Sequence, residues 1–138
     1  MSENREVLEV DILFVGAGAA SLAGALRLHQ LLSEHNARVA STGQGSALSP
    51  MIAAIEKGSE VGAHSLSGAV LDPVALRELI PDFESKGCPI EKRVEAEDVY
   101  FLTKKHALRF PVTPPPLRNH GLPIVSLARF NRWLRGLV

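Results

Sequence analysis

Several features that would assign this 138-residue chain to a specialised class are scarce or missing. Cys88 is the single cysteine, which excludes a disulfide framework and a cluster of thiolates for zinc or iron–sulfur within these residues. No run of residues approaches the roughly eighteen apolar residues of a membrane span, and the polar start does not read as a signal peptide. We therefore expect residues 1–8 to form a disordered tail, and the setting to be the bacterial cytoplasm.

Acidic residues are missing from the last part of the chain. All fifteen lie at or before Asp98 against eight Lys and Arg, so residues 1–98 carry −7, and residues 99–138, with seven Lys and Arg, carry +7. Such a split is typical of a protein that meets anionic lipid, an acidic partner or nucleic acid, although a folded chain can also mix both parts into one neutral surface. No RNA-binding motif or recognition helix accompanies the basic part, so no nucleic acid partner is expected.

The stretch DILFVGAGAASL (Asp11–Leu22) is the most informative one that is present. An apolar run predicts a strand over residues 9–15, buried on both faces if the sheet is parallel. The two glycines Gly16 and Gly18 predict a sharp turn, and an apolar stripe predicts a helix over residues 19–35. A strand, glycine turn and helix in this order are typical of a dinucleotide-binding βαβ unit, in which the helix N-terminus meets a pyrophosphate. A tight turn without a ligand remains the alternative.

A second strand ending in an acid should follow, because an acid there binds the adenosine ribose. Arg38–Ala40 is short and has no acid after it, whereas Met51–Ile55 is more apolar and ends at Glu56. We favour Met51–Ile55, with residues 36–50 as an inserted loop. The small cost of lengthening a surface loop allows this spacing.

The remaining chain predicts smaller elements. Asp72-Pro73 starts a short helix that ends near Pro81, and residues 82–98 are polar and irregular. Val99–Leu102 and Ala107–Phe110 predict a hairpin with a basic tip, and Ser126–Leu137 predicts an amphipathic helix. The fold class is therefore α/β, with a Rossmann-type unit, a β-hairpin and a C-terminal amphipathic helix. A resemblance to a known family implies that residues 9–138 form an incomplete Rossmann-type FAD-binding domain.

The FAD in that assignment comes from a resemblance carried by IEKGSEVGAHSLSGAVLDP (Ile55–Pro73), then ELIPDF (Glu78–Phe83), NHG (Asn119–Gly121) and IVSL (Ile124–Leu127). From Asp11 onward, apart from residues around 40–50, the chain resembles the N-terminal quarter of the electron transfer flavoprotein–ubiquinone oxidoreductase family. The resemblance implies a flavoprotein dehydrogenase that takes electrons from electron transfer flavoprotein and reduces ubiquinone. It also implies contact with a membrane surface near residues 59–79, peripheral to the bacterial inner membrane.

The same resemblance implies a set of cofactor-binding residues: Gly16, Gly18, Ala20, Ser21, Glu56, Lys57, Leu66, Ser67 and Gly68. The glycine turn would hold the pyrophosphate of FAD, Glu56 the adenosine ribose, and Leu66–Gly68 would lie near the flavin ring. No residue is assigned a catalytic acid–base role or a metal ion. The iron–sulfur cluster belongs to the parent enzyme, and its ligands have no counterpart here.

Two other interpretations stay open. ARFNRWL (Ala128–Leu134) resembles a helix of FAD-dependent isoprenoid reductases and aromatic monooxygenases, which would change the substrate. The chain could also be a non-catalytic truncated fragment that associates with itself or with a membrane. Because the segments that cover the flavin ring in the resembled oxidoreductase family come from later sequence, we expect the 138 residues alone to hold FAD weakly, if at all, and to reduce no quinone.

Overall fold

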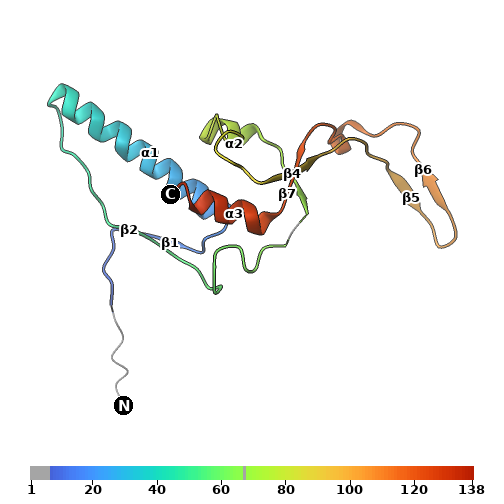
Figure 1. Ribbon diagram of the computed structural model, residues 1–138, viewed down its shortest axis with the longest axis horizontal. Coiled ribbons are helices and arrows are strands. Elements are labelled where there is room, and N and C mark those ends of the chain that lie inside the picture. The colour runs from blue at the N-terminus through green and yellow to red at the C-terminus, as the bar shows by residue number, and fades with distance from the viewer. Residues whose placement is uncertain (1–6, 67) are drawn as a thin grey trace, which may run out of the picture. The chain divides into compact units, whose positions relative to one another are not determined.

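The computed structural model describes residues 7–66 and 68–138 (Figure 1). The tail expected over residues 1–8 therefore falls largely outside the described residues. The chain divides into two compact units, one made by the residues up to Ser65 together with Asn131–Val138 and the other by Leu66–Phe130.

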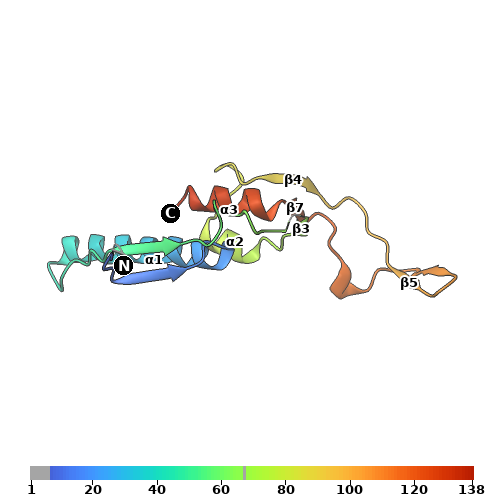
Figure 2. The same cartoon turned by 90° about the horizontal axis from the view of Figure 1, so that it is seen from below.

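The first unit is built on a parallel β–α–β arrangement. Strand β1 (Ile12–Val15) leads through the glycine turn into helix α1 (Ala19–Thr42), and the chain returns to strand β2 (Ile52–Ile55). The two strands pair in parallel, with Ile12 opposite Ile52 and Val15 opposite Ile55. Figure 2 shows the strands side by side along α1. The strand–turn–helix prediction is confirmed, as is the choice of Met51–Ile55 over Arg38–Ala40 for the second strand.

Helix α1 is longer than its apolar stripe predicts. It continues to Thr42 and ends at Gly43, which has φ 66° and donates its N–H to the carbonyl of Val39 at 2.9 Å. The prediction of a helix ending at 35 and a loop over 36–50 is therefore wrong for residues 36–42. The physical reason is that a left-handed glycine is a strong helix stop, whereas the polar residues before it do not break a helix.

One face of the β1–β2 sheet packs against α1. The α1 side chains Leu22, Ala25 and Leu26 are buried. A Cβ on Gly24 would lie 3.3 Å from the ring of Phe14, so helix and strand approach closely there. The opposite face is open: Leu13 is 48% and Val15 75% exposed. The prediction that the first strand is buried on both faces is therefore wrong, because α1 covers only one of them among the described residues.

The second unit contains a three-stranded antiparallel sheet in the order β3 (Ala69–Val70), β7 (Pro123–Val125), β4 (Ile90–Arg93). Residues 82–98 were predicted to be irregular, which is wrong for β4. Its polar sequence shows no strand periodicity, and the strand forms by pairing with β7. Helix α2 (Val74–Leu79) is preceded by Asp72, which accepts the Val74 N–H at 3.1 Å.

A separate hairpin completes this unit. Its strands β5 (Tyr100–Leu102) and β6 (Ala107–Arg109) pair with each other and with neither β3, β4 nor β7 in the described part of the chain. They confirm the predicted hairpin. A short 3₁₀ turn, η1 (Pro115–Leu117), follows it.

Helix α3 (Leu127–Arg135) confirms the predicted amphipathic helix. Phe130 and Leu134 are buried on its apolar side. On its polar side Arg129 pairs with Glu91 at 2.7 Å within the second unit, and Arg132 with Glu60 at 2.9 Å within the first. These ion pairs join the basic end of the sequence to its acidic part, so the charge split is partly neutralised.

Candidate functional site

The glycine turn lies where the parallel strands end. Gly16 has φ +94°, a conformation that L side chains rarely adopt, and its N–H donates to the carbonyl of Ile55 at 2.8 Å. Gly18 is the N-cap of α1 and has an extended conformation, φ −79° and ψ 174°, that any residue can adopt. Of these two glycines, only Gly16 has a backbone conformation that requires glycine.

Space remains in front of both glycines. A Cβ built on Gly16 or on Gly18 would meet no atom within 4 Å. The amides of Ala19, Ala20 and Ser21 follow in the first turn of α1, where helix amides lack an intrahelical acceptor and carry a partial positive charge. No acidic side chain stands in that turn, and Gly18 offers no side-chain cap. These features fit the pyrophosphate of a dinucleotide.

Glu56 follows β2 and connects its end to the glycine turn. Its Oε2 accepts the N–H of Ala17 at 2.8 Å, and its Oε1 accepts the N–H of Gly58 at 2.8 Å. These hydrogen bonds, that of Gly58 first and that of Ala17 second, hold the pKa of the carboxyl group below its ordinary value, and the charge of His64 acts in the same direction. Glu56 is therefore an ionised acceptor at neutral pH, as a group that binds ribose hydroxyls must be.

The close fit of Gly58 defines the shape of this corner. A Cβ there would lie 3.1 Å from the carbonyl oxygen of Glu60, 3.2 Å from the Cβ of Ala63 and 3.3 Å from Oε1 of Glu56. Sequence reasoning singled out Glu56 but not the amides of Ala17 and Gly58 that hold it. The spacing of an acid and a glycine two residues apart, directly after a strand, was the available signal.

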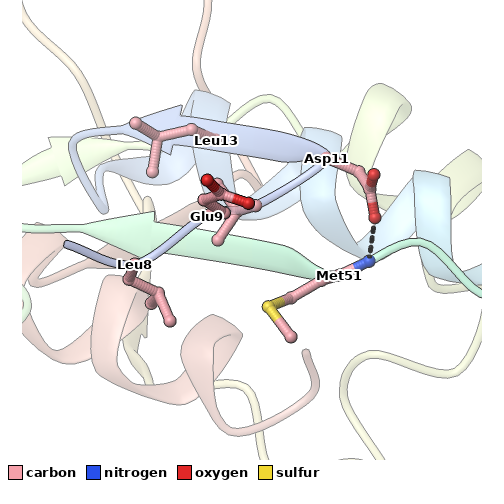
Figure 3. A pocket seen from close by; sticks show the side chains of 6 residues that line it. Leu8, Glu9, Asp11, Leu13 and Met51 are labelled. Atoms are coloured by element: carbon pink, nitrogen blue, oxygen red, sulfur yellow. Dashed lines mark hydrogen bonds between the residues drawn. The ribbon is translucent and has the colours of Figure 1, made fainter.

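A pocket of about 280 Å³ lies at the carboxyl ends of the strands and is lined by Val15, Gly16, Ile55, Glu56 and Lys57. A larger one, of about 780 Å³, lies at their amino ends beside Asp11, which accepts the Met51 N–H at 2.7 Å (Figure 3). We assign the site to the smaller pocket, because ligands of parallel α/β sheets bind at the carboxyl ends of the strands.

The sequence-predicted site residues separate into two groups. The structure brings six of them together around the glycine turn and the end of β2 in the first unit: Gly16, Gly18, Ala20, Ser21, Glu56 and Lys57. Leu66, which is 84% exposed, and Gly68, with φ +86°, belong to the second unit. Ser67 lies outside the described residues. That these three lie near a flavin ring stays a prediction.

Comparison with known proteins gives a consistent set of relatives. The chain is 45% identical over 130 residues to the mitochondrial electron transfer flavoprotein–ubiquinone oxidoreductase of Dictyostelium discoideum, covering 94% of the chain and 20% of that protein. It is 39% identical over 127 residues to the enzyme of the same name from Rattus norvegicus, covering 91% of the chain and 19% of that protein. The Pseudomonas aeruginosa protein is 40% identical over 133 residues, covering 94% and 22%. No protein-family model matches the chain.

The chain is thus homologous to electron transfer flavoprotein–ubiquinone oxidoreductases and spans about a fifth of their length. This confirms the resemblance read from Ile55–Pro73 and the motifs after it. The parallel β1–α1–β2 unit agrees with part of a Rossmann-like domain. Two further observations concern the described residues alone. No helix among them is long and apolar enough to cross a membrane, and no three of their His, Cys, Asp or Glu side chains are placed to share a metal ion.

Proposed function

We propose that this chain supplies the ADP-binding part of an FAD-dependent oxidoreductase that accepts electrons from electron transfer flavoprotein and reduces ubiquinone. The substrates come from the printed name of its relatives, of which the chain spans about a fifth. The ADP-binding role has a support of its own in the geometry. The observation that carries it is the Glu56 carboxylate, which joins the end of β2 to the glycine turn through the Ala17 amide.

In this proposal the pyrophosphate and the ribose of the ADP half each bind to specific groups of the chain. The pyrophosphate lies against Gly16 and Gly18 and accepts hydrogen bonds from the amides of Ala20 and Ser21 in the first turn of α1. The ribose hydroxyls donate to Glu56, and Lys57 lines the same pocket. FAD, when bound, supplies the redox chemistry, and the chain's own groups bind and orient it.

A membrane surface is the third partner in the proposal, and the β5–β6 hairpin supports it. Its apolar side chains face water instead of a core: Phe101 is 59%, Leu102 71% and Leu108 59% exposed. Lys104 and Lys105 stand in the turn between the strands. Exposed apolar side chains beside basic ones are typical of segments that dip into the interface of an anionic bilayer. The contact expected near residues 59–79 stays a prediction.

Vesicle binding tests this partner. The chain should sediment with vesicles containing phosphatidylserine more than with neutral vesicles. Reversing both charges, Lys104→Glu with Lys105→Glu, should lower the partition coefficient at least tenfold, because each basic residue near such a surface contributes about 1 kcal/mol. Lys86→Glu with Lys92→Glu, two charge reversals outside the hairpin, is the matched control. Equal loss from this control would remove the support that the hairpin gives.

Competition between nucleotides tests the ADP-binding role. The chain should bind FAD in equilibrium dialysis, ADP should displace it, and riboflavin, which lacks the ADP half, should neither bind nor compete. This pattern follows because every group assigned above contacts the ADP half. Binding of riboflavin as strong as that of FAD, or FAD binding that ADP does not reduce, would contradict the proposal.

A further inference from the structure

The Glu56 carboxylate does more than point toward a ligand, because both of its oxygens already accept backbone N–H groups. Oε2 bonds to Ala17, inside the glycine turn after β1, and Oε1 bonds to Gly58, inside the turn after β2. We propose that Glu56 is a positioning residue that holds the two turns in their ligand-binding shape before a dinucleotide arrives. The inference rests on the proposed function and adds a second role to the residue that binds the ribose.

The glycine turn needs such a support. Gly16 has φ +94°, and Ala17 next to it is only 5% exposed. A backbone amide at a buried position needs an acceptor, since an unpaired one costs free energy comparable to a lost hydrogen bond. The only acceptor that the described structure gives the Ala17 N–H is the carboxylate of Glu56, which lies thirty-nine residues further along the chain.

Because of the hydrogen bond between Ala17 and Glu56, neighbouring amides of the glycine turn have different roles. The Ala17 N–H is committed to Glu56, so the pyrophosphate must be met by the amides that follow it, from Gly18 to Ser21. The ribose hydroxyls need not displace Ala17 or Gly58, because each carboxylate oxygen has two lone pairs and the bond to either amide occupies one of them. The ligand then binds to a preformed corner, which lowers the ordering cost of association.

Gly58 donates the second backbone hydrogen bond to the Glu56 carboxylate, from the turn after β2. The position its Cβ would take lies 3.3 Å from Oε1 of Glu56, so a side chain there would push on the carboxylate that its own amide holds. The positioning unit therefore consists of Ala17, Glu56 and Gly58.

The first test needs no ligand. The amide proton shifts of Ala17 and Gly58 in the wild-type chain are followed by NMR as pH is lowered. Both should move along one titration curve with its midpoint below that of an ordinary glutamate, because protonation neutralises the carboxylate and weakens both of its bonds to these amides. The curve should vanish in Glu56→Gln, and it should persist in His64→Gln and in Glu60→Gln, a matched change at an acid that pairs with Arg132 instead. Amides of Ala17 and Gly58 that do not titrate together in the wild type would overturn the proposal.

The second test separates positioning from ribose binding. ADP and 2′,3′-dideoxy-ADP are titrated into wild type and Glu56→Gln by calorimetry. A positioning role predicts that Glu56→Gln weakens both nucleotides, the dideoxy form by about three- to tenfold, although that form has no hydroxyl for Glu56 to bind. Loss confined to ADP would overturn the proposal and leave Glu56 as a ribose ligand alone. Failure of both nucleotides to bind the wild type would contradict the proposed function, and the ligand-free titration would still decide the positioning role.

Discussion

Gly18→Asp is expected to stabilise the protein and at the same time to impair nucleotide binding. Gly18 is the N-cap of α1, in an extended conformation that an aspartate adopts without strain, and a Cβ there meets no atom within 4 Å. An aspartate at an N-cap accepts an amide of the first turn and is favoured by the helix dipole. The same carboxylate would occupy the position proposed for the pyrophosphate.

The two effects differ in sign and in size. Replacing glycine by aspartate at this cap should raise the free energy of unfolding by about 0.5–1 kcal/mol, combining the capping hydrogen bond with the dipole interaction. Two unit charges about 5 Å apart repel by about 1 kcal/mol in bulk water and by about 3 kcal/mol at the effective dielectric constant of a protein surface. The affinity for FAD or ADP should therefore fall at least tenfold.

Urea unfolding measures the first effect, and ADP titration by calorimetry measures the second. Gly18→Ser is the matched control, because it adds a cap of similar strength without the charge and should weaken ADP binding less than Gly18→Asp. An aspartate variant that folds and binds ADP as the wild type does would refute the placement of the pyrophosphate at this turn.

Three further predictions concern stability and exposure. Gly24→Val should lower the free energy of unfolding by about 1–3 kcal/mol, because its side chain would press on Phe14. Ala37→Val on the same helix is the control and should lower it by no more than the helix-propensity difference of about 0.5 kcal/mol. A urea titration in which both variants lose the same free energy would argue against the close contact. Asn36 exchanges two 2.8 Å hydrogen bonds with the backbone of Leu48, so Asn36→Ala should speed proteolysis within residues 43–50 several-fold, and an unchanged cleavage rate would contradict that anchoring role. Burial, helped by the charge of Glu84, raises the pKa of Cys88 to about 11. The stability that the neutral thiol contributes is therefore present below the ordinary thiol pKa and is lost as pH rises through 11. Iodoacetamide at pH 8 should modify Cys88 only at the rate of unfolding, and fast labelling of the folded chain would disprove this.

The first unit could be predicted from the sequence because its signals are local. The apolar run before Gly16, the glycine turn and the stripe of α1 each lie within one element, and Glu56 stands at the end of the strand that the apolar residues indicate. The end of α1 was missed because the residues from 36 to 42 are neither strongly favourable nor strongly unfavourable in a helix. Gly43, the glycine that ends the helix, is the residue from which this end could have been predicted.

The remaining parts depend on contacts between distant residues. The β4 residues Ile90–Arg93 are mostly polar, and pairing with β7 makes them a strand. The open face of β1 could not be predicted either, because an apolar run reads the same whether one layer or two cover it. In the site, the residue types pointed to Glu56, whereas its bonds to Ala17 and Gly58 follow only from the three-dimensional arrangement.

A residue-by-residue NMR titration of the wild-type chain with ADP tests the central claim most directly. The account predicts that the amides from Gly16 to Ser21 and from Glu56 to Gly58 shift together and saturate with one dissociation constant, while those of the β5–β6 hairpin stay unchanged. Shifts that gather elsewhere, or a spectrum that ADP leaves unchanged up to millimolar concentration, would contradict the claim that this corner binds the ADP half of FAD.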